Sequence, residues 1–150
     1  MKNYLLASQA AKVMNIPASE IARLGQVITP SVPAEGKGHR SLYDFRNLIE
    51  MKIVIILSAF NVPQKTIRHF LANLRGSRFQ WLDEQGRDGW IVLDTQGRWS
   101  AGETLTDAIA AMLPPIDAIV SIDLIPVKQF FRERLPQEAE VIPAEFAKVS

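Results

Sequence analysis

The stretch from Asp44 to Phe60 restricts the possible folds more than any other part of the sequence. Its apolar side chains recur at the spacing of one helix face, at Phe45, Leu48, Ile49, Ile53, Ile56, Leu57 and Phe60. Further apolar residues lie outside that stripe, at Met51, Val54 and Ile55. We therefore predict a helix with Asp44 as its N-cap. A helix that is apolar nearly all round must be covered on more than one side, so we expect the C-terminal half or a second subunit to cover it.

Length and composition limit the class of protein. With 150 residues, the chain can bury a sizeable core as one domain or as two small ones. Zero cysteines exclude disulfides, thiolate nucleophiles and Cys-ligated metal sites. The longest strongly apolar run, Ile53 to Leu57, is far shorter than the roughly 20 residues that cross a bilayer, and the N-terminus lacks a secretory pattern. We expect a cytoplasmic protein that makes no use of a membrane.

The charge of the chain is divided between its halves. Residues 1–78 contain eleven Lys or Arg and four Asp or Glu, a net charge of +7. Residues 79–150 contain six basic and twelve acidic residues, a net charge of −6. Such asymmetry indicates a head that binds a polyanion, joined to a different module. Nucleic acid is the first partner to consider.

Two short helices are expected near the N-terminus. Small and apolar residues from Ala7 to Met14 predict a two-turn helix that ends at Asn15, and residues 16–21 predict a turn into a second helix. Ile21 and Leu24 would face inward. The outward residues of the second helix are Ser19, Glu20, Ala22, Arg23 and Gln26. This arrangement is a helix-turn-helix, whose second helix can enter a major groove.

A Pro- and Gly-containing segment, residues 29–39, separates these helices from the long apolar one and predicts a turn or a short hairpin. Its end places three cationic or titratable side chains on flexible backbone, at Lys37, His39 and Arg40, which suits a phosphate or minor-groove contact. After residues 61–63, a last helix of the basic half would hold Ile67, Phe70, Leu71 and Leu74 inward and Lys65, Arg68, His69 and Arg75 outward.

The order and spacing of residues 3–75 resemble the DNA-binding domain of the MerR-like winged helix-turn-helix family. The resemblance is clearest at residues 36–48 (GKGHRSLYDFRNL), which are similar to the family's wing and the start of its third helix, and at residues 60–67 (FNVPQKTI). In that family the second helix reads the major groove, while a wing Arg and a Tyr hold the phosphate backbone. The resemblance assigns contact with the phosphate backbone to Arg40, as the wing Arg, and to Tyr43.

The sequence also departs from the family's pattern. Many members have an Arg followed by aromatic residues in the second helix, whereas Ile21 is followed here by Ala22, Arg23 and Leu24. Three residues lead from Arg40 to Tyr43, where two is commoner. The Cys-rich metal loop and the long dimerisation helix of the family are missing, so metal sensing is unsupported.

The acidic half predicts a small α+β unit. Residues 79–82 and 90–93 are expected to be strands around a hairpin loop at residues 83–89, with a second turn at residues 95–98. Thr104 would cap a helix that stops at the two prolines 114 and 115, and residues 116–125 alternate as a strand does. A closing helix follows, with its apolar side chains at Val127, Phe130, Phe131 and Leu135.

The expected fold is therefore a mainly α N-terminal winged helix-turn-helix joined to a small α+β C-terminal domain. Residues 1–76 would be the DNA-binding domain. Residues 77–136 would serve in dimerisation, sensing or partner binding, and residues 137–150 would form a tail that is mobile or docks on a partner.

The leading functional hypothesis is a sequence-specific transcriptional regulator that binds double-stranded DNA, on a partly palindromic operator, as a homodimer. The residues expected to contact DNA are Ser19, Glu20, Arg23, Lys37, His39, Arg40 and Tyr43. Two of them have structural alternatives: Arg23 as an ion pair with Glu20, and Tyr43 as packing beneath the wing.

A second hypothesis is an antitoxin-like or adaptor protein whose acidic half binds a protein partner, and the apolar and acidic residues of the tail motivate it. The acidic half also loosely resembles segments that follow MerR-like heads in some bacterial proteins, including antitoxin-like ones. An enzyme is disfavoured, since with two histidines and no cysteine no Ser/His/Asp or Cys/His arrangement, phosphate-binding glycine loop or metal-ligand spacing can be assembled. No metal and no cofactor are expected. The three tryptophans of the acidic half are interpreted as core rather than as an aromatic ligand pocket.

Overall fold

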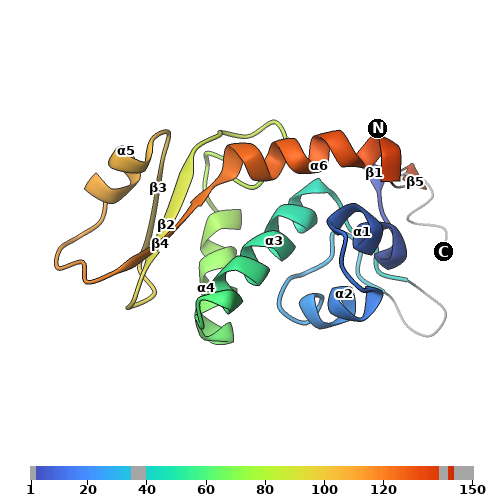
Figure 1. Cartoon of the computed structure of the whole chain (residues 1–150), viewed down its shortest axis with the longest axis horizontal. Helices are drawn as coiled ribbons and strands as arrows, with labels where there is room; N and C mark the ends of the chain where they lie inside the picture. The colour runs from blue at the N-terminus through green and yellow to red at the C-terminus, as the bar shows by residue number, and fades with distance from the viewer. Residues whose placement is uncertain (1–2, 35–39, 139–141, 144–150) are drawn as a thin grey trace. The chain divides into compact units, whose positions relative to one another are not determined.

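The structure is a computed structural model that describes residues 3–34, 40–138 and 142–143. Over these residues it combines six helices with a three-stranded antiparallel sheet, so the expected mixture of α and β structure is confirmed (Figure 1). The chain divides into two compact units, one made of Met1–Met51 with Gln129–Ser150 and one of Lys52–Lys128. The domain assignments with boundaries after residues 76 and 136 stay predictions.

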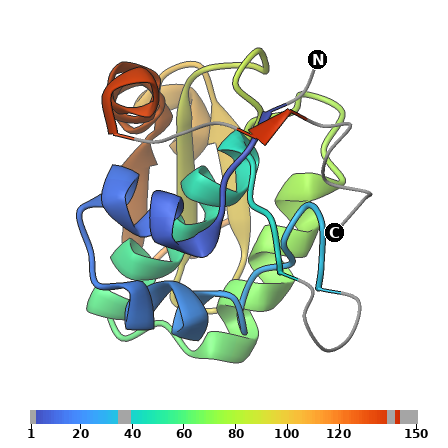
Figure 2. The same ribbon diagram turned by 90° about the vertical axis from the view of Figure 1, so that its right-hand side faces the viewer.

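The first unit begins with strand β1 (Asn3–Tyr4) and helices α1 (Ala7–Met14) and α2 (Ala18–Leu24). Near the other end of the chain, β5 (Ile142–Pro143) pairs with β1 in antiparallel register, and Figure 2 shows the two strands side by side. This part of the expected tail is therefore docked on the chain itself.

The predicted bounds of α1 are confirmed, and its end has a local cause. Asn15 adopts the left-handed conformation, with φ 56°, which stops the helix as such a residue usually does. Pro17 then serves as the N-cap of α2, where a missing N–H costs nothing. Ile21 and Leu24 are both fully buried, as predicted from their spacing.

The segment after α2 is held by single antiparallel bridges. Val32 pairs with Leu42 through two hydrogen bonds of 2.8 and 3.1 Å, and Leu5 pairs with Tyr43. The predicted turn or hairpin therefore has the described residues 31–34 and 40–43 as its two arms.

Helix α3 (Phe45–Ala59) matches the predicted apolar helix. Its stripe is buried at Leu48, Ile49, Ile53 and Leu57, and Met51 and Val54 on the other faces are buried too, so one copy of the chain covers the helix on more than one side. Phe60 differs from the prediction. It lies past the helix end and is 64% exposed, because the backbone turns into the left-handed conformation at Asn61.

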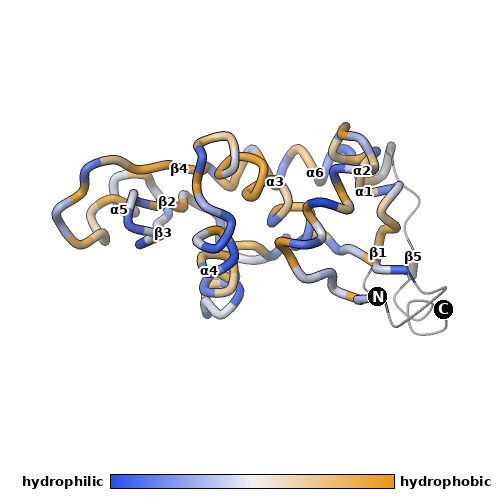
Figure 3. The backbone as a smooth tube through the Cα atoms, turned by 90° about the horizontal axis from the view of Figure 1, so that it is seen from below, coloured by the Kyte–Doolittle hydropathy of each residue, from blue (hydrophilic) through white to orange (hydrophobic). Residues whose placement is uncertain are grey.

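The second unit contains α4 (Gln64–Arg75) and a sheet of β2 (Trp90–Asp94), β3 (Trp99–Gly102) and β4 (Ile119–Asp123), in the order β3-β2-β4. In α4 the four predicted apolar residues are buried, and Figure 3 shows its tube changing between hydrophilic and hydrophobic colours. Helix α5 (Leu105–Ala110) packs on β2 and β3.

The hairpin was predicted at the wrong loop. The structure joins β2 to β3 through residues 95–98, the turn that the sequence analysis placed second, while residues 79–82 form turns rather than a strand. Gln80 has a φ of 53°, which breaks an extended run, and the neighbouring Trp81 and Leu82 are buried as packing residues. The Thr104 cap is confirmed, since its side chain accepts a hydrogen bond from the Asp107 N–H.

Helix α6 (Leu124–Glu138) is the predicted closing helix, but it begins inside the strand predicted over residues 116–125, which is limited to β4, and it continues past residue 136. Its N-cap is Asp123, whose Oδ1 accepts a 3.1 Å hydrogen bond from the Ile125 N–H. Within its first turns Lys128 is fully buried, and its Nζ lies 3.1 Å from both Asp88 Oδ1 and the Arg87 carbonyl oxygen. Among the described helices, none has the length and apolar character needed to span a bilayer.

Candidate nucleic-acid interface

The outward face of α2 is the first part of the candidate interface. Helix α2 packs against α1, and its Ile21 and Leu24 are buried, whereas Ser19, Ala22 and Arg23 are exposed and Glu20 is partly exposed. The turn between the two helices is short because Asn15 ends one helix and Pro17 starts the next. The predicted exposure of this face is confirmed for the residues that were expected to contact DNA.

Arg23 and Glu20 form the ion pair that was considered as an alternative. The Arg23 Nη2 atom lies 2.8 Å from Glu20 Oε2, and Nε donates to the same oxygen at 3.0 Å. Both side chains are about half exposed, so the pair is of the screened surface type that contributes on the order of 0.5 kcal/mol. Such a pair orients the guanidinium but leaves it free to exchange its partner for a phosphate or a base.

The arms of the segment between α2 and α3 hold the remaining predicted residues. Arg40 is exposed at the start of the second arm. Lys37 and His39 lie outside the described residues, so their expected contacts stay predictions.

Tyr43 is buried, whereas a residue that contacts DNA must be exposed. It is 5% exposed, its backbone pairs with Leu5, and its hydroxyl would lie 3.4 Å from a Cβ atom at Gly25. Burial raises the pKa of the Tyr43 hydroxyl, and a hydrogen bond with Ser41 acts in the opposite direction. The structure thus favours the packing alternative, in which Tyr43 supports the loop from below rather than holding a phosphate.

A buried polar cluster fixes the base of the same segment, and the sequence analysis did not find it. Asn47 is fully buried in the first turn of α3. Its Oδ1 accepts hydrogen bonds from the N–H groups of Ser31 at 2.9 Å and Asp44 at 3.2 Å. Its Nδ2 donates to the Thr29 carbonyl oxygen at 3.0 Å and to Glu50 Oε1 at 3.1 Å.

One half of this cluster had a signal in the sequence. The Asp44 side chain accepts from the Asn47 N–H at 3.0 Å while Asn47 bonds back to the Asp44 N–H, which is a capping box with Asn in the third position. The bonds to Thr29 and Ser31 join positions 18 and 16 residues apart, and no local pattern indicates them. These two bonds attach the start of the loop that follows α2 to the first turn of α3.

Arg134 was also missed, and it ties the end of α1 in place. Its Nε donates to the Val13 carbonyl oxygen at 2.6 Å and its Nη2 to that of Lys12 at 3.3 Å. These carbonyls belong to the last turn of α1, where hydrogen bonds are unfilled and a cation is favourable. Arg134 therefore fixes the helix that supports α2.

The cations of α4 are part of the second unit. Lys65, Arg68 and His69 are exposed there, as predicted, and Arg75 is partly exposed. A part for these residues in binding a polyanion stays a prediction. Among the described residues, no group of three or more His, Asp or Glu side chains is arranged to hold a metal ion.

The comparisons with known proteins assign no family. No protein-family model matches the sequence, and no curated protein is significantly similar to it.

Proposed function

We propose that the chain is a sequence-specific DNA-binding transcriptional regulator of the winged helix-turn-helix type, which binds a partly palindromic operator as a homodimer. One observation carries this proposal: α2 is a short helix that packs on α1, with Ile21 and Leu24 buried and its polar face exposed. That is the geometry a recognition helix needs, because a major groove admits one helix with its side chains directed outward.

The proposal divides the contacts by their role. Arg23, together with Ser19 on the same face, selects sequence from the groove. Arg40, at the arm of the loop that follows α2, contacts the backbone and adds affinity without sequence preference. The positive charge of residues 1–78 supports this, since phosphate neutralisation supplies most non-specific affinity.

The experiment is an electrophoretic shift assay of the full chain, first with random DNA to select a bound sequence and then with that sequence at several salt concentrations. We expect retention that weakens as salt rises. Arg40→Ala should weaken binding to all sequences, whereas Arg23→Ala should change the preference among them. Arg87→Ala is the matched control, because it removes one positive charge from the acidic half at an exposed ion pair. Failure to retain any fragment at low salt would refute the proposal.

The homodimer part of the proposal has its own test. Selection should return two half-sites related by inverted symmetry, spaced by about one helical turn or a multiple of it. Light scattering of the full chain should give twice the mass of 16.8 kDa. A monomer that selects a single half-site would overturn the dimer while leaving DNA binding in place.

A second candidate is the antitoxin-like or adaptor role, with a protein partner bound by the acidic half. The observation that favours it is exposed apolar surface around the end of α5: Leu113 is 71% exposed, Ile109 37% and Ile116 36%. Leu113→Glu should abolish capture of a stoichiometric partner while leaving DNA retention unchanged. If the Leu113→Glu variant captures that partner as well as the natural chain does, this surface is not its site.

A further inference from the structure

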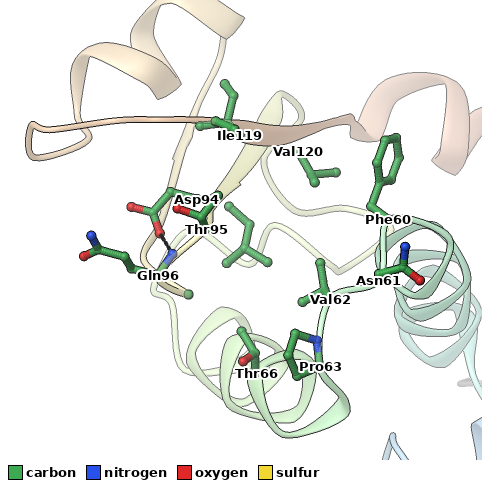
Figure 4. A pocket seen from close by; sticks show the side chains of 13 residues that line it. Phe60, Asn61, Val62, Pro63, Thr66, Asp94, Thr95, Gln96, Ile119 and Val120 are labelled. Atoms are coloured by element: carbon green, nitrogen blue, oxygen red, sulfur yellow. Dashed lines mark hydrogen bonds between the residues drawn. The ribbon is translucent and has the colours of Figure 1, made fainter.

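The second unit contains a pocket that the proposed function does not use. It has a volume of about 450 Å³, within the range of about 300 to 1,000 Å³ typical of small-molecule sites. Three segments line it: the turn between α3 and α4, the end of β2 with its hairpin turn, and the start of β4. In Figure 4 the side chains of Ile119 and Val120 lie on one side and those of Val62, Pro63 and Thr66 on the other.

Local hydrogen bonds hold two of these walls in place. In the turn before α4, the N–H of Asn61 donates to the Ser58 carbonyl oxygen and that of Val62 to Leu57, both at 3.0 Å. In the hairpin turn, Gly97 has a φ of 81°, and a Cβ atom there would lie 3.1 Å from Thr66 Cγ2. The Gly97 N–H also donates to the Asp94 carbonyl oxygen at 3.2 Å. Because these two walls are fixed by their own backbone, the pocket exists before any ligand arrives, which lowers the entropic cost of binding.

The charge of the lining limits the ligand. Asp94 is the only ionisable residue that lines the pocket within the described part of the chain, and it is 7% exposed. Its Oδ1 accepts from the N–H groups of Gln96 at 2.9 Å and Arg98 at 2.8 Å, and its Oδ2 lies 2.7 Å from Arg98 Nε. A carboxylate already occupied in this way offers no counter-charge to a cation, and the pocket offers none to an anion.

Phe60 gives the second reason to expect an occupant. It lines one end of the pocket and is 64% exposed, so a large part of its ring faces water. Apolar surface removed from water is a general source of binding free energy, and an aromatic ring supplies more of it than most side chains do. A ligand in the pocket would cover part of this ring.

We infer that this pocket binds an uncharged, largely apolar small molecule with a hydrogen-bonding group. Asn61 and Thr66 are uncharged polar residues of the lining, so they are the candidates to meet that group. The inference stands apart from DNA binding, because every residue that forms the pocket belongs to the second unit.

The test uses the full chain and a pair of dyes that differ by one sulfonate group. N-phenyl-1-naphthylamine is neutral, and 8-anilino-1-naphthalenesulfonate is the same molecule with a sulfonate. We expect the neutral dye to bind saturably at one site per chain with a rise in fluorescence, and the sulfonate to bind at least about tenfold more weakly, as expected for an uncompensated charge in an apolar site. No saturable binding of the neutral dye, or equal affinity for both dyes, would overturn the inference.

Variants locate the dye. Ala118→Phe places a ring in the pocket from an exposed position of the lining. It should lower the affinity for the neutral dye by about tenfold or more, because the dye would have to pack into space that the ring already fills. Ala110→Phe is the control, since Ala110 is exposed on α5 away from the pocket, and it should change the affinity less than about twofold. Phe60→Ala should weaken binding several-fold without loss of fold. If Ala118→Phe and Phe60→Ala both leave the affinity unchanged, the dye binds elsewhere and the inference fails.

Discussion

Replacing Asn47 by Ala tests the buried cluster at the base of the loop between α2 and α3. The change deletes four hydrogen bonds, two accepted by Oδ1 and two donated by Nδ2. Those to Ser31 and Thr29 lie in a half-buried region, where water replaces the lost partner. Those to the Asp44 N–H and to Glu50 lie in a buried region, where water does not enter freely.

The expected loss follows from these two kinds of bond. A hydrogen bond contributes about 1 kcal/mol net, and a buried partner that loses one costs about 1 to 3 kcal/mol. Water recovers some of the half-buried bonds, so we expect the free energy of unfolding to fall by about 3 kcal/mol. That is a large part of the roughly 5–15 kcal/mol that stabilises a typical protein.

Urea unfolding followed by far-ultraviolet circular dichroism measures this loss. With a slope of about 1.5 kcal/mol per molar urea, the midpoint should fall by about 2 M. Asn73→Ala is the matched control, because Asn73 is exposed on α4 and its Nδ2 donates to the local His69 carbonyl oxygen. It should cost less than about 0.5 kcal/mol. A loss below about 1 kcal/mol for Asn47→Ala, with an unchanged slope, would show that the cluster does not hold the loop.

Three further predictions concern buried polar groups. Burial raises the pKa of the Tyr43 hydroxyl above its ordinary value of 10.0, so the stability that this hydroxyl contributes is complete below pH 10.0 and is lost as the pH rises through the raised pKa. Tyr43→Phe should reduce this alkaline loss of stability, measured as the free energy of unfolding from about pH 8 to 12. A pH profile that is the same for the variant and the natural chain would contradict this prediction. Burial alone would raise the pKa of Asp94, but the hydrogen bonds from Arg98 and Gln96 outweigh burial and lower it, so its contribution is present above the ordinary 3.8 and is lost as the pH falls through the lowered value. Asp94→Asn should cost about 2 kcal/mol at about pH 7 and flatten the acid side of the profile. Asp88→Ala removes the carboxylate beside the fully buried Lys128 and should cost about 2 kcal/mol in urea unfolding, whereas a double variant that also replaces Lys128 by Met should recover part of it; a double variant less stable than the single one would refute this.

Local rules predicted the helices of this chain well. The bounds of α1 and the cap residues Asp44 and Thr104 follow from side chains that act within one helical turn, so their effect is visible in the sequence. The buried faces of α3 and α4 follow from spacing alone. Phe60 is the exception, since spacing does not show where a left-handed residue ends the helix.

Strand pairing and side-chain networks were harder to predict. The composition of two apolar runs, residues 79–82 and 90–93, is suited to strands. Only residues 90–93 form a strand, because they pair with β3 and β4 as part of β2. In the candidate interface, the exposed face of α2 was predictable, because the spacing of Ile21 and Leu24 determines which face of the helix is turned inward. The burial of Tyr43 and the contacts of Arg134 depend on segments far away in the sequence, and the pocket beside Asp94 arises where three such segments meet.

The two-part first unit has a consequence for how the protein is made. Arg134 bonds to Val13 across 121 positions, so this contact forms only after residue 134 has left the ribosome. Lys52–Lys128 is complete only about 1 s or less before that, at roughly 5–20 residues per second, so Val13 waits for its partner until the inner segment has been made. A fragment cut after residue 76 would lack Arg134 and would lose the donor that it supplies to the last carbonyl groups of α1.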